Sequence, residues 1–431
     1  LFPDGRHLVV DPSLDQTCEN IAQFSDHDAE AYRKFNTHFT KMLAVAGIGS
    51  QSAPPPYGMM HAAMYASPEG REFQRVLVTS AQDICEEWFE SPEVRMTLTR
   101  WCTEMMIDPR QIGTSALLYF TGTVHDPANL GSPFPKGGCV TFVKALTDCC
   151  TDMGADLFAG DPVNEVALEN GEAKYVRTEG GLEYVADNAV ISTINIKQLY
   201  DFMGDAAPEK EAYAIDKLKF ADFSAFNMSY ALKKEPIFKC GEDIKKAFDI
   251  EVAPATEKEY LNTFSSFTLG ETTTKMPCIN MPCLLDPTRV PGSGCVVNIY
   301  NYAPYALYGD PKNWATHKDE MQQEIWEYTK SFWTNITDDD IIGSWCMSPT
   351  DYEEWDKSMI HGDIGQIGLQ PSQYYDMRPL VGRGHEYHGE IENLYFLGSC
   401  SHPGGGIAAS ARSGVQRVLE DYGIDFLEVV K

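Results

Sequence analysis

The sequence predicts a mixed α/β protein with more than one packed core, and three observations carry this prediction. A short apolar run at 394–397 leads through a glycine-rich loop into a stretch of helical composition at 407–419. A strand–turn–strand pattern is centred on Asn170-Gly171, a strong hairpin-turn signal. Helical spacing dominates residues 15–39 and 71–106.

The first third of the chain is expected to be mostly helical. Ser25 to Asp28 offers an N-cap for the first helical region, and Ser91-Pro92 breaks the second. The stretch Phe2 to Arg6 is expected to form a hairpin turn between strands.

The middle of the chain turns to strands. Phe134 to Gly138 predicts a turn before a helix, and the hairpin around Asn170 is expected to continue to a strand ending near 193. Further strands are expected at 225–232 and 295–302, followed by a helix at 314–332.

The glycine-rich loop at Gly404 to Gly406 is the most informative feature. Glycine lets a backbone approach a ligand closely, and a helix N-terminus offers free N–H groups with a partial positive charge. Strand, loop and helix together predict a seat for an anionic or electron-rich cofactor. No Gly-Lys-Ser/Thr follows the glycines, so this is not the Walker pattern.

This segment resembles the C-terminal flavin-binding signature of the phytoene desaturase-like FAD-dependent oxidoreductases, which include carotenoid desaturases and isomerases and retinol saturase. The residues that match the family motif, and that the resemblance implies bind FAD, are Gly398, Ser399, His402, Pro403, Gly404, Gly405, Gly406 and Ile407. The hairpin matches the family's connection back to the FAD sheet. There the resemblance implies cofactor contacts for Val163, Ser192 and Thr193.

The resemblance implies a two-dinucleotide-domain flavoprotein fold with an interleaved substrate domain and a helical cap. Residues 1–130 would hold a strand start and the cap. Residues 131–200 and 361–431 would form parts of the FAD-binding domain, and residues 201–360 the substrate-binding domain.

The chain departs from the family in one respect, because no Gly-x-Gly-x-x-Gly turn between a strand and a helix is found. The nearest match, Gly47 to Ser52, is rejected because Pro54-Pro55-Pro56 follows it and no helix starts in that way. We therefore expect a detached N-terminal segment or a separate polypeptide to supply this unit of ~30 residues, so that the working protein is a processed chain or a hetero-oligomer.

Charge and composition narrow the function classes. The 431 residues carry 63 acidic against 34 basic side chains, a net charge of −29, which speaks against nucleic acid and anionic membrane surfaces as partners. No apolar run approaches the ~20 residues of a membrane span, and membrane association is otherwise left open.

The twelve cysteines form no Cys-x-x-Cys pair and no His lies at ligand spacing, so no metal site is expected. A disulfide framework is not expected at this length. Reduced, mostly buried thiols and a cytoplasmic location are the expectation.

Catalytic residues are harder to assign, because hydride chemistry belongs to the flavin. His361, in His361-Gly362-Asp363, resembles a short family motif and is a candidate acid/base, with a histidine bonded within the core as the alternative. His402 lies nearer the flavin by motif. Tyr302 belongs to an aromatic run that lines an apolar cavity or packs in the core.

The sequence thus predicts an FAD-dependent oxidoreductase, of the dehydrogenase, desaturase or saturase type, acting on an apolar small molecule. The alternatives are a flavin amine or amino-acid oxidase, or a non-catalytic subunit of a split flavoenzyme.

Overall fold

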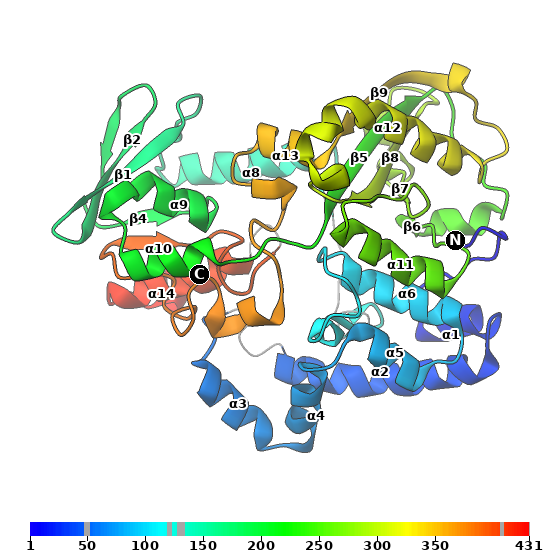
Figure 1. The fold of residues 1–431 in the computed structure, drawn as a ribbon, viewed down its shortest axis with the longest axis horizontal. Helices are drawn as coiled ribbons and strands as arrows, with labels where there is room; N and C mark the ends of the chain where they lie inside the picture. Colours follow the sequence, from blue (N-terminus) through cyan, green and yellow to red (C-terminus); the bar gives the residue numbers. More distant parts are fainter. Residues whose placement is uncertain (47–51, 119–122, 127–133, 406–408, 431) are drawn as a thin grey trace.

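A computed structural model describes residues 1–46, 52–118, 123–126, 134–405 and 409–430. Buried side chains gather into a helical body, a body built on an antiparallel sheet, and a smaller α/β body. Figure 1 shows the α/β body on the left, the sheet at the upper right and the helices below. The mixed α/β prediction is confirmed.

The helical body is formed by the N-terminal part of the chain. Its helices are α1 (Leu14–Ala22), α2 (Asp26–Ala46), α3 (Tyr57–Tyr65), α4 (Pro68–Val76), α5 (Ala81–Trp88) and α6 (Pro92–Thr103). Ser91 caps α6 and Pro92 occupies its first turn, as the sequence predicts. Aromatic side chains of α2, among them Phe35 and Phe39 with ring centroids 4.2 Å apart, fill the core.

Two local expectations differ from the structure. The helical region at 15–39 is divided into α1 and α2, because the Ser25 side chain accepts a hydrogen bond from the Asp28 N–H and starts a new helix there. The turn at Phe2–Arg6 forms, but no strand flanks it. Instead the backbone of Leu1 hydrogen-bonds to Glu251 and Ala253, beside the sheet.

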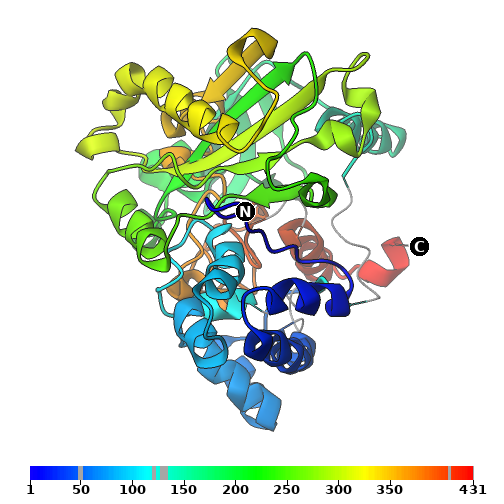
Figure 2. The same ribbon diagram turned by 90° about the vertical axis from the view of Figure 1, so that its right-hand side faces the viewer.

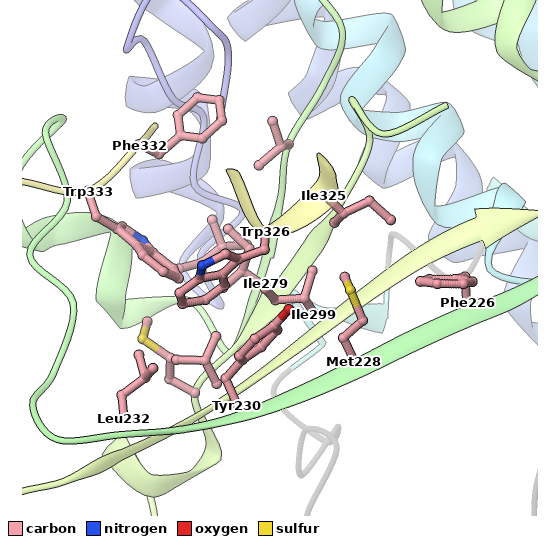
Figure 3. Close-up of a cluster of buried hydrophobic side chains, with 14 of the residues drawn as sticks. Phe226, Met228, Tyr230, Leu232, Ile279, Ile299, Ile325, Trp326, Phe332 and Trp333 are labelled. Atoms are coloured by element: carbon pink, nitrogen blue, oxygen red, sulfur yellow. The ribbon is translucent and has the colours of Figure 1, made fainter. Parts of the chain in front are cut away.

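The antiparallel sheet has the strand order β6-β7-β8-β5-β9. The bounds are Ser224–Leu232 for β5, Asp249–Glu251 for β6, Cys278–Asn280 for β7, Cys295–Ala303 for β8 and Ile341–Met347 for β9. Helices α11 (Glu257–Thr268), α12 (Trp314–Lys330) and α13 (Pro349–Trp355) accompany it. Figure 3 shows Met228, Tyr230 and Leu232 of β5 facing Ile325 and Trp326 of α12.

The α/β body contains two small sheets. Strands β1 (Val163–Glu169), β2 (Glu172–Thr178) and β3 (Glu183–Val185) form an antiparallel sheet, while β4 (Val190–Ser192) pairs in parallel with β10 (Leu394–Phe396). Helices α9 (Ile196–Met203), α10 (Glu209–Asp216), α14 (Ala409–Asp421) and α15 (Phe426–Val429) complete it.

The boundary of this body lies later than the predicted residue 200. Apolar side chains of α9 and α10, including Met203 and Ile215, pack in one core with Val166 of β1 and Leu394 of β10. The sheet body therefore begins after α10, near the start of β5. The reason is that both helices bury apolar side chains in this core, α9 against β1 and α10 against α9.

Helix α8 (Cys139–Asp152) differs from the others. Every residue from 139 to 160 is exposed, although the helix carries Val140, Phe142, Val143 and Leu146. Figure 2 shows this helix, in teal, at the periphery of the molecule. In the part of the chain that the structure describes, no helix is long and apolar enough to cross a membrane.

Candidate cofactor and active site

Two predicted cofactor segments, far apart in the sequence, meet in the structure. Strand β10 runs parallel to β4 with Phe396 opposite Ser192, and the Leu397 N–H donates to the Ser192 carbonyl at 2.8 Å. Both strands are short and apolar, so pairing buries Leu394 and Phe396 in the core of the α/β body. The carboxyl ends of the two strands lie at one edge, where ligands bind in parallel sheets.

Gly398 is required by a close backbone approach at this edge. A Cβ on Gly398 would lie 2.3 Å from the carbonyl oxygen of Thr193. A side chain would therefore push β10 away from the end of β4. The predicted residues Ser192, Thr193 and Gly398 thus form one junction.

The glycine loop follows directly, and its two described glycines have different surroundings. Gly404 (φ 79°) lies over the Arg378 side chain, and a Cβ there would be 2.5 Å from Nε. Gly405 (φ 64°) faces open space, because the nearest heavy atom to a Cβ there is a Leu369 methyl at 3.8 Å. Gly406 and Ile407 lie outside the described residues.

Arg378 is a fully buried cation that supports the loop. Its Nη2 donates to the carbonyls of Ser399 at 2.6 Å and Ile367 at 3.0 Å, and its Nη1 donates to that of Gly368 at 2.9 Å. Burial lowers the pKa of the guanidinium. The bonds fix the position of Ser399, so Arg378 acts on the loop through the backbone.

His402 and Pro403 follow on the buried side of the same loop. The His402 carbonyl accepts a hydrogen bond from the Tyr387 hydroxyl at 3.0 Å, and the imidazole stacks on Tyr375 with centroids 5.8 Å apart. The Tyr387 hydroxyl oxygen also lies 2.8 Å from the Ser413 hydroxyl of α14, from which it can accept a hydrogen bond. These contacts join the loop to the helix that follows it, which fits an orienting role for His402.

Sequence reasoning missed Asn195. This residue holds residues 358–366, the crossover segment between the antiparallel sheet and the α/β body, against the junction. Its Oδ1 caps α9 by accepting from the Lys197 N–H at 3.0 Å, and its Nδ2 donates to the carbonyls of Gln366 at 2.7 Å and Ser358 at 3.1 Å. The available signal was an Asn directly before a helical pattern, which predicts an N-cap. Asn195 thereby ties residues 358–366 to the end of β4.

His361 lies in that crossover segment, between the α/β body and the antiparallel sheet. Its ring stacks on Tyr305 at 4.6 Å and packs against Phe220 at 4.5 Å between centroids. Partial desolvation by these rings lowers its pKa below the usual 6.5, although His361 keeps an exposed surface, so the imidazole is neutral at pH 7. The Tyr305 hydroxyl donates a hydrogen bond to the Glu353 carboxylate, so a carboxylate lies next to the stacked rings of Tyr305 and His361.

The residues after His361 fix its backbone. The Ser224 hydroxyl donates to the Gly362 carbonyl at 2.6 Å, and Asp363, itself buried, accepts from the Ala221 N–H at 2.7 Å. These hydrogen bonds hold two segments side by side, and each segment crosses between the two bodies: residues 220–224 and residues 361–363. This double crossing positions His361 between the two bodies.

Tyr302 has a different environment from His361. Its hydroxyl donates to Glu104 at 2.8 Å and bonds to Arg100, whose guanidinium lies 4.3 Å from the Tyr302 ring centre. Arg100 also pairs with Glu251 at 2.8 Å. Burial raises the pKa of the Tyr302 hydroxyl. Its bonds therefore link β8 to α6, and the structure does not bring Tyr302 together with either predicted catalytic histidine.

Val163 and the Gly137-Gly138 turn flank the α/β body. Val163 begins β1 and is 37% exposed. Gly137 (φ 85°) and Gly138 (φ 102°) form the turn before α8, as the sequence predicts. The Gly137 N–H donates to the Asp286 carboxylate at 2.6 Å, which ties the turn to the sheet body.

One pocket beside Tyr305 does not fit the apolar cavity expected there. It has a volume of about 350 Å³ and is lined by charges of both signs, including Lys312, Lys318, Asp351 and Glu354. The apolar cavity between the glycine loop and the tyrosines of β8 stays a prediction.

Comparisons with known proteins bear on this arrangement. No model of a protein family matches the sequence. The chain is 24% identical over 469 residues to pyridine nucleotide-disulfide oxidoreductase domain-containing protein 2 of Rattus norvegicus, covering 96% of this chain and 77% of that protein.

Two bacterial proteins are similar to nearly the whole chain. A limonene dehydrogenase subunit from Castellaniella defragrans is 23% identical, covering 99% of this chain and 80% of its own length. The lycopene-forming phytoene desaturase of Pseudescherichia vulneris is 21% identical, covering 93% and 77%.

Among solved structures, an oxidoreductase from Methanosarcina mazei shares the fold, with a TM-score of 0.53 and 13% identity over 79% of this chain and 68% of that one. The sequence similarities, which cover 93% to 99% of this chain, extend over all three bodies rather than the glycine loop alone.

Proposed function

We propose that this chain, a phytoene desaturase-like FAD-dependent oxidoreductase, adds or removes hydrogen across a carbon–carbon or carbon–heteroatom bond of an apolar small molecule. Limonene and phytoene, in the names of two relatives, are apolar compounds. The observation that carries the proposal is the junction of Thr193, Gly398, Ser399 and Gly405 at the ends of two parallel strands. When bound, FAD supplies the hydride acceptor or donor.

The residues at this junction fit a flat cofactor. Gly405 has no side chain, and among the described residues the nearest atom to the position of a Cβ is a Leu369 methyl at 3.8 Å, so a ring can lie against its backbone. Arg378 holds the Ser399 carbonyl and lies against Gly404, whereas the position of a Cβ on Gly405 has no Arg378 atom near it. Ser192, Thr193, Gly398, Ser399, His402, Pro403, Gly404 and Gly405 are the described residues that would hold FAD.

We assign His361 the acid/base role in this proposal. A neutral imidazole at pH 7 can accept a proton at one ring nitrogen. Tyr305 and Phe220 contact the ring and hold its plane, while the residue keeps a solvent-exposed surface. A proton leaving or reaching the substrate carbon would therefore pass through a histidine that is held in place by aromatic contacts.

The cofactor site is tested by Gly405→Val with Gly423→Val as its matched control. Both glycines have positive φ, 64° and 70°, and both face open space, so the backbone strain is similar. In the native sample, with the completing segment present, Gly405→Val should abolish FAD absorbance, and Gly423→Val should retain it. Normal flavin absorbance in the Gly405 variant would reject the site.

The reaction is tested by anaerobic bleaching of the bound flavin with limonene as an apolar probe and cyclohexylamine as a contrasting amine. His361→Gln should slow bleaching by the apolar probe by ~100-fold with flavin still bound, whereas the exposed His27→Gln should not change it. Bleaching by the amine alone would favour the amine oxidase alternative. Unchanged rates in His361→Gln would return this residue to a packing role.

We further propose that a strand–turn–helix segment with the Gly-x-Gly-x-x-Gly pattern completes the FAD-binding part. Two features support it. Strand β4 is the outer strand of a two-stranded parallel sheet, a type normally covered on both faces, and Ile191 on it is 48% exposed. Helix α8 has no buried residue, although it carries Val140, Phe142, Val143 and Leu146.

Whether that segment is part of the same gene product or a separate polypeptide is decided by the mass of every chain in the native sample, together with its flavin content. A sample with this chain alone, monomeric and binding one FAD per chain, would refute the proposal. We also propose a cytoplasmic location, supported by twelve cysteines that are all unpaired in the structure.

A further inference from the structure

Two cysteines of the sheet body lie in direct contact. Cys283, in the short 3₁₀ helix Pro282–Leu284, and Cys295, the first residue of β8, have their sulfur atoms 3.2 Å apart. Their side chains are 6% and 2% exposed. Sequence spacing did not pair them, because eleven residues of loop separate the two positions.

The surroundings distinguish the two sulfurs. The Val296 N–H donates to the Cys283 sulfur at 3.4 Å, and the Cys295 thiol is placed to donate to it as well. These hydrogen bonds lower the pKa of Cys283 to about 6, while the pKa of Cys295 is raised. Cys283 is therefore the thiolate of the pair and Cys295 the protonated partner.

The loop between these cysteines holds the turn that begins α8. Asp286 accepts from the Gly137 N–H at 2.6 Å, and Arg289 donates to the Pro135 carbonyl at 3.1 Å. The Arg289 guanidinium also lies over the Phe134 ring at 5.6 Å. A covalent bond between Cys283 and Cys295 would close this loop at its base.

We propose that Cys283 and Cys295 form a reversible disulfide, which closes the 284–294 loop and thereby steadies the Gly137-Gly138 turn. The oxidant is a peroxide, small enough to reach a sulfur with little exposed surface. The Cys283 thiolate attacks one peroxide oxygen, giving a sulfenic acid and releasing hydroxide.

The Cys295 sulfur then attacks the Cys283 sulfur. The S–S bond forms, the S–O bond breaks, and hydroxide leaves. With the Cys295 proton and one from solvent, both hydroxides become water, so two electrons pass from the two sulfurs to hydrogen peroxide. A dithiol reverses the reaction by exchange.

The test uses a Cys139→Ser/Cys149→Ser/Cys150→Ser background, because these three cysteines are exposed and would form intermolecular bonds. The folded protein is treated with hydrogen peroxide, alkylated under denaturing conditions without reductant, and mapped by peptide mass spectrometry. We expect one linked peptide pair, Cys283 with Cys295, with the loss of two hydrogens, and its disappearance after dithiothreitol.

Matched variants identify the pair. Cys283→Ser and Cys295→Ser should each lose the linked peptide, and Cys346→Ser, on β9, should keep it. In Cys295→Ser the Cys283 sulfenic acid should persist and react with dimedone. Recovery of both thiols as alkylated cysteines after peroxide, or Cys283 linked to any other cysteine, would overturn the proposal.

Hydrogen exchange tests the consequence for α8. In the oxidised protein the Gly137 amide should exchange more slowly than in the reduced protein, and Cys283→Ser should show no difference with peroxide. Equal exchange of the Gly137 amide in the oxidised and reduced proteins, with both cysteines present, would show that the disulfide does not steady the turn.

Discussion

Arg378 shows how one buried residue can organise a glycine loop through backbone carbonyls. Its donors reach the carbonyls of Ser399, Gly368 and Ile367, which belong to the glycine loop and to the crossover segment near His361. A guanidinium can satisfy several carbonyls at once because its donors form a rigid planar fork. The two halves of the proposed active site therefore share one support.

Glu251 gives a prediction for pH dependence. Burial raises its pKa from the usual 4.5 to about 7, opposed by the charge of Arg100. A carboxyl whose folded pKa is raised stabilises the fold below pH 4.5 and loses that contribution as the pH rises through 7. Its side chain is 31% exposed, so solvent reduces the effect to ~1–2 kcal/mol.

Glu251→Gln removes this titration. Between pH 4.5 and 7.5 the unsubstituted protein should lose ~1–2 kcal/mol of unfolding free energy relative to the variant. Urea unfolding of both proteins at the two pH values measures this. Glu259→Gln, an exposed carboxylate on α11, serves as the control and should show a constant difference. A constant difference for Glu251→Gln as well would contradict the raised pKa.

At the residue scale, the sequence predicted which residues belong to the site better than it predicted which residues contact one another. The resemblance pointed to Thr193, Gly398 and Ser399, and the structure places them together. That Gly398 is required by the Thr193 carbonyl could not be predicted, because the distance depends on the pairing of β4 with β10. The contact of Cys283 with Cys295 was equally invisible, since loop geometry and not spacing brings them together.

At the scale of elements, one buried carboxylate joins two helices of the helical body. Asp28, in the first turn of α2, accepts from the N–H groups of Glu90 at 2.9 Å and Ser91 at 2.8 Å. These groups lead into α6, so a side chain of α2 caps the start of another helix.

Asp28→Ala should destabilise the protein by ~2–4 kcal/mol, because one buried and one part-buried backbone donor lose their partner. Asp26→Asn, in the same turn but exposed, should change stability by less than ~0.5 kcal/mol. Both are measured by urea denaturation. An Asp28→Ala midpoint equal to that of Asp26→Asn would show that water replaces the carboxylate.

Elements with strong local signals were predicted well. Asn170 (φ 54°) and Gly171 (φ 86°) form the hairpin turn, and Ser91-Pro92 begins α6. The break between α1 and α2 was missed, because Ser25 was considered as a cap within a single region. The expected strands around Phe2 were wrong. The hydrogen bonds of the turn are local, whereas a strand needs a neighbouring strand with which it can pair.

At the scale of the whole molecule, the uncovered surface of α8 is the largest departure from normal packing. Phe142 and Leu146 are 39% and 49% exposed on a helix that has no buried residue. An apolar helix is normally retained in a sequence because it packs against something. The sequence predicted the helix from its composition, but its exposure depends on tertiary contacts.

Phe142→Ser/Leu146→Ser should leave the free energy of unfolding of this chain unchanged within ~0.5 kcal/mol and should reduce binding of a hydrophobic dye. Phe264→Ser, a buried residue of α11, should by contrast cost ~3–5 kcal/mol. A large loss of stability in the α8 variant would mean that the helix packs within this chain.

The parallel pairing of β4 with β10 also affects the order in which the chain can fold during its synthesis. Val190 leaves the ribosome long before its partner Leu394, and at about 5–20 residues per second the delay is on the order of tens of seconds. The antiparallel sheet, encoded entirely between these strands, can fold during that interval. The nascent chain therefore carries β4 without its partner until residue 394 has been made, and a premature stop before that residue would leave β4 without β10.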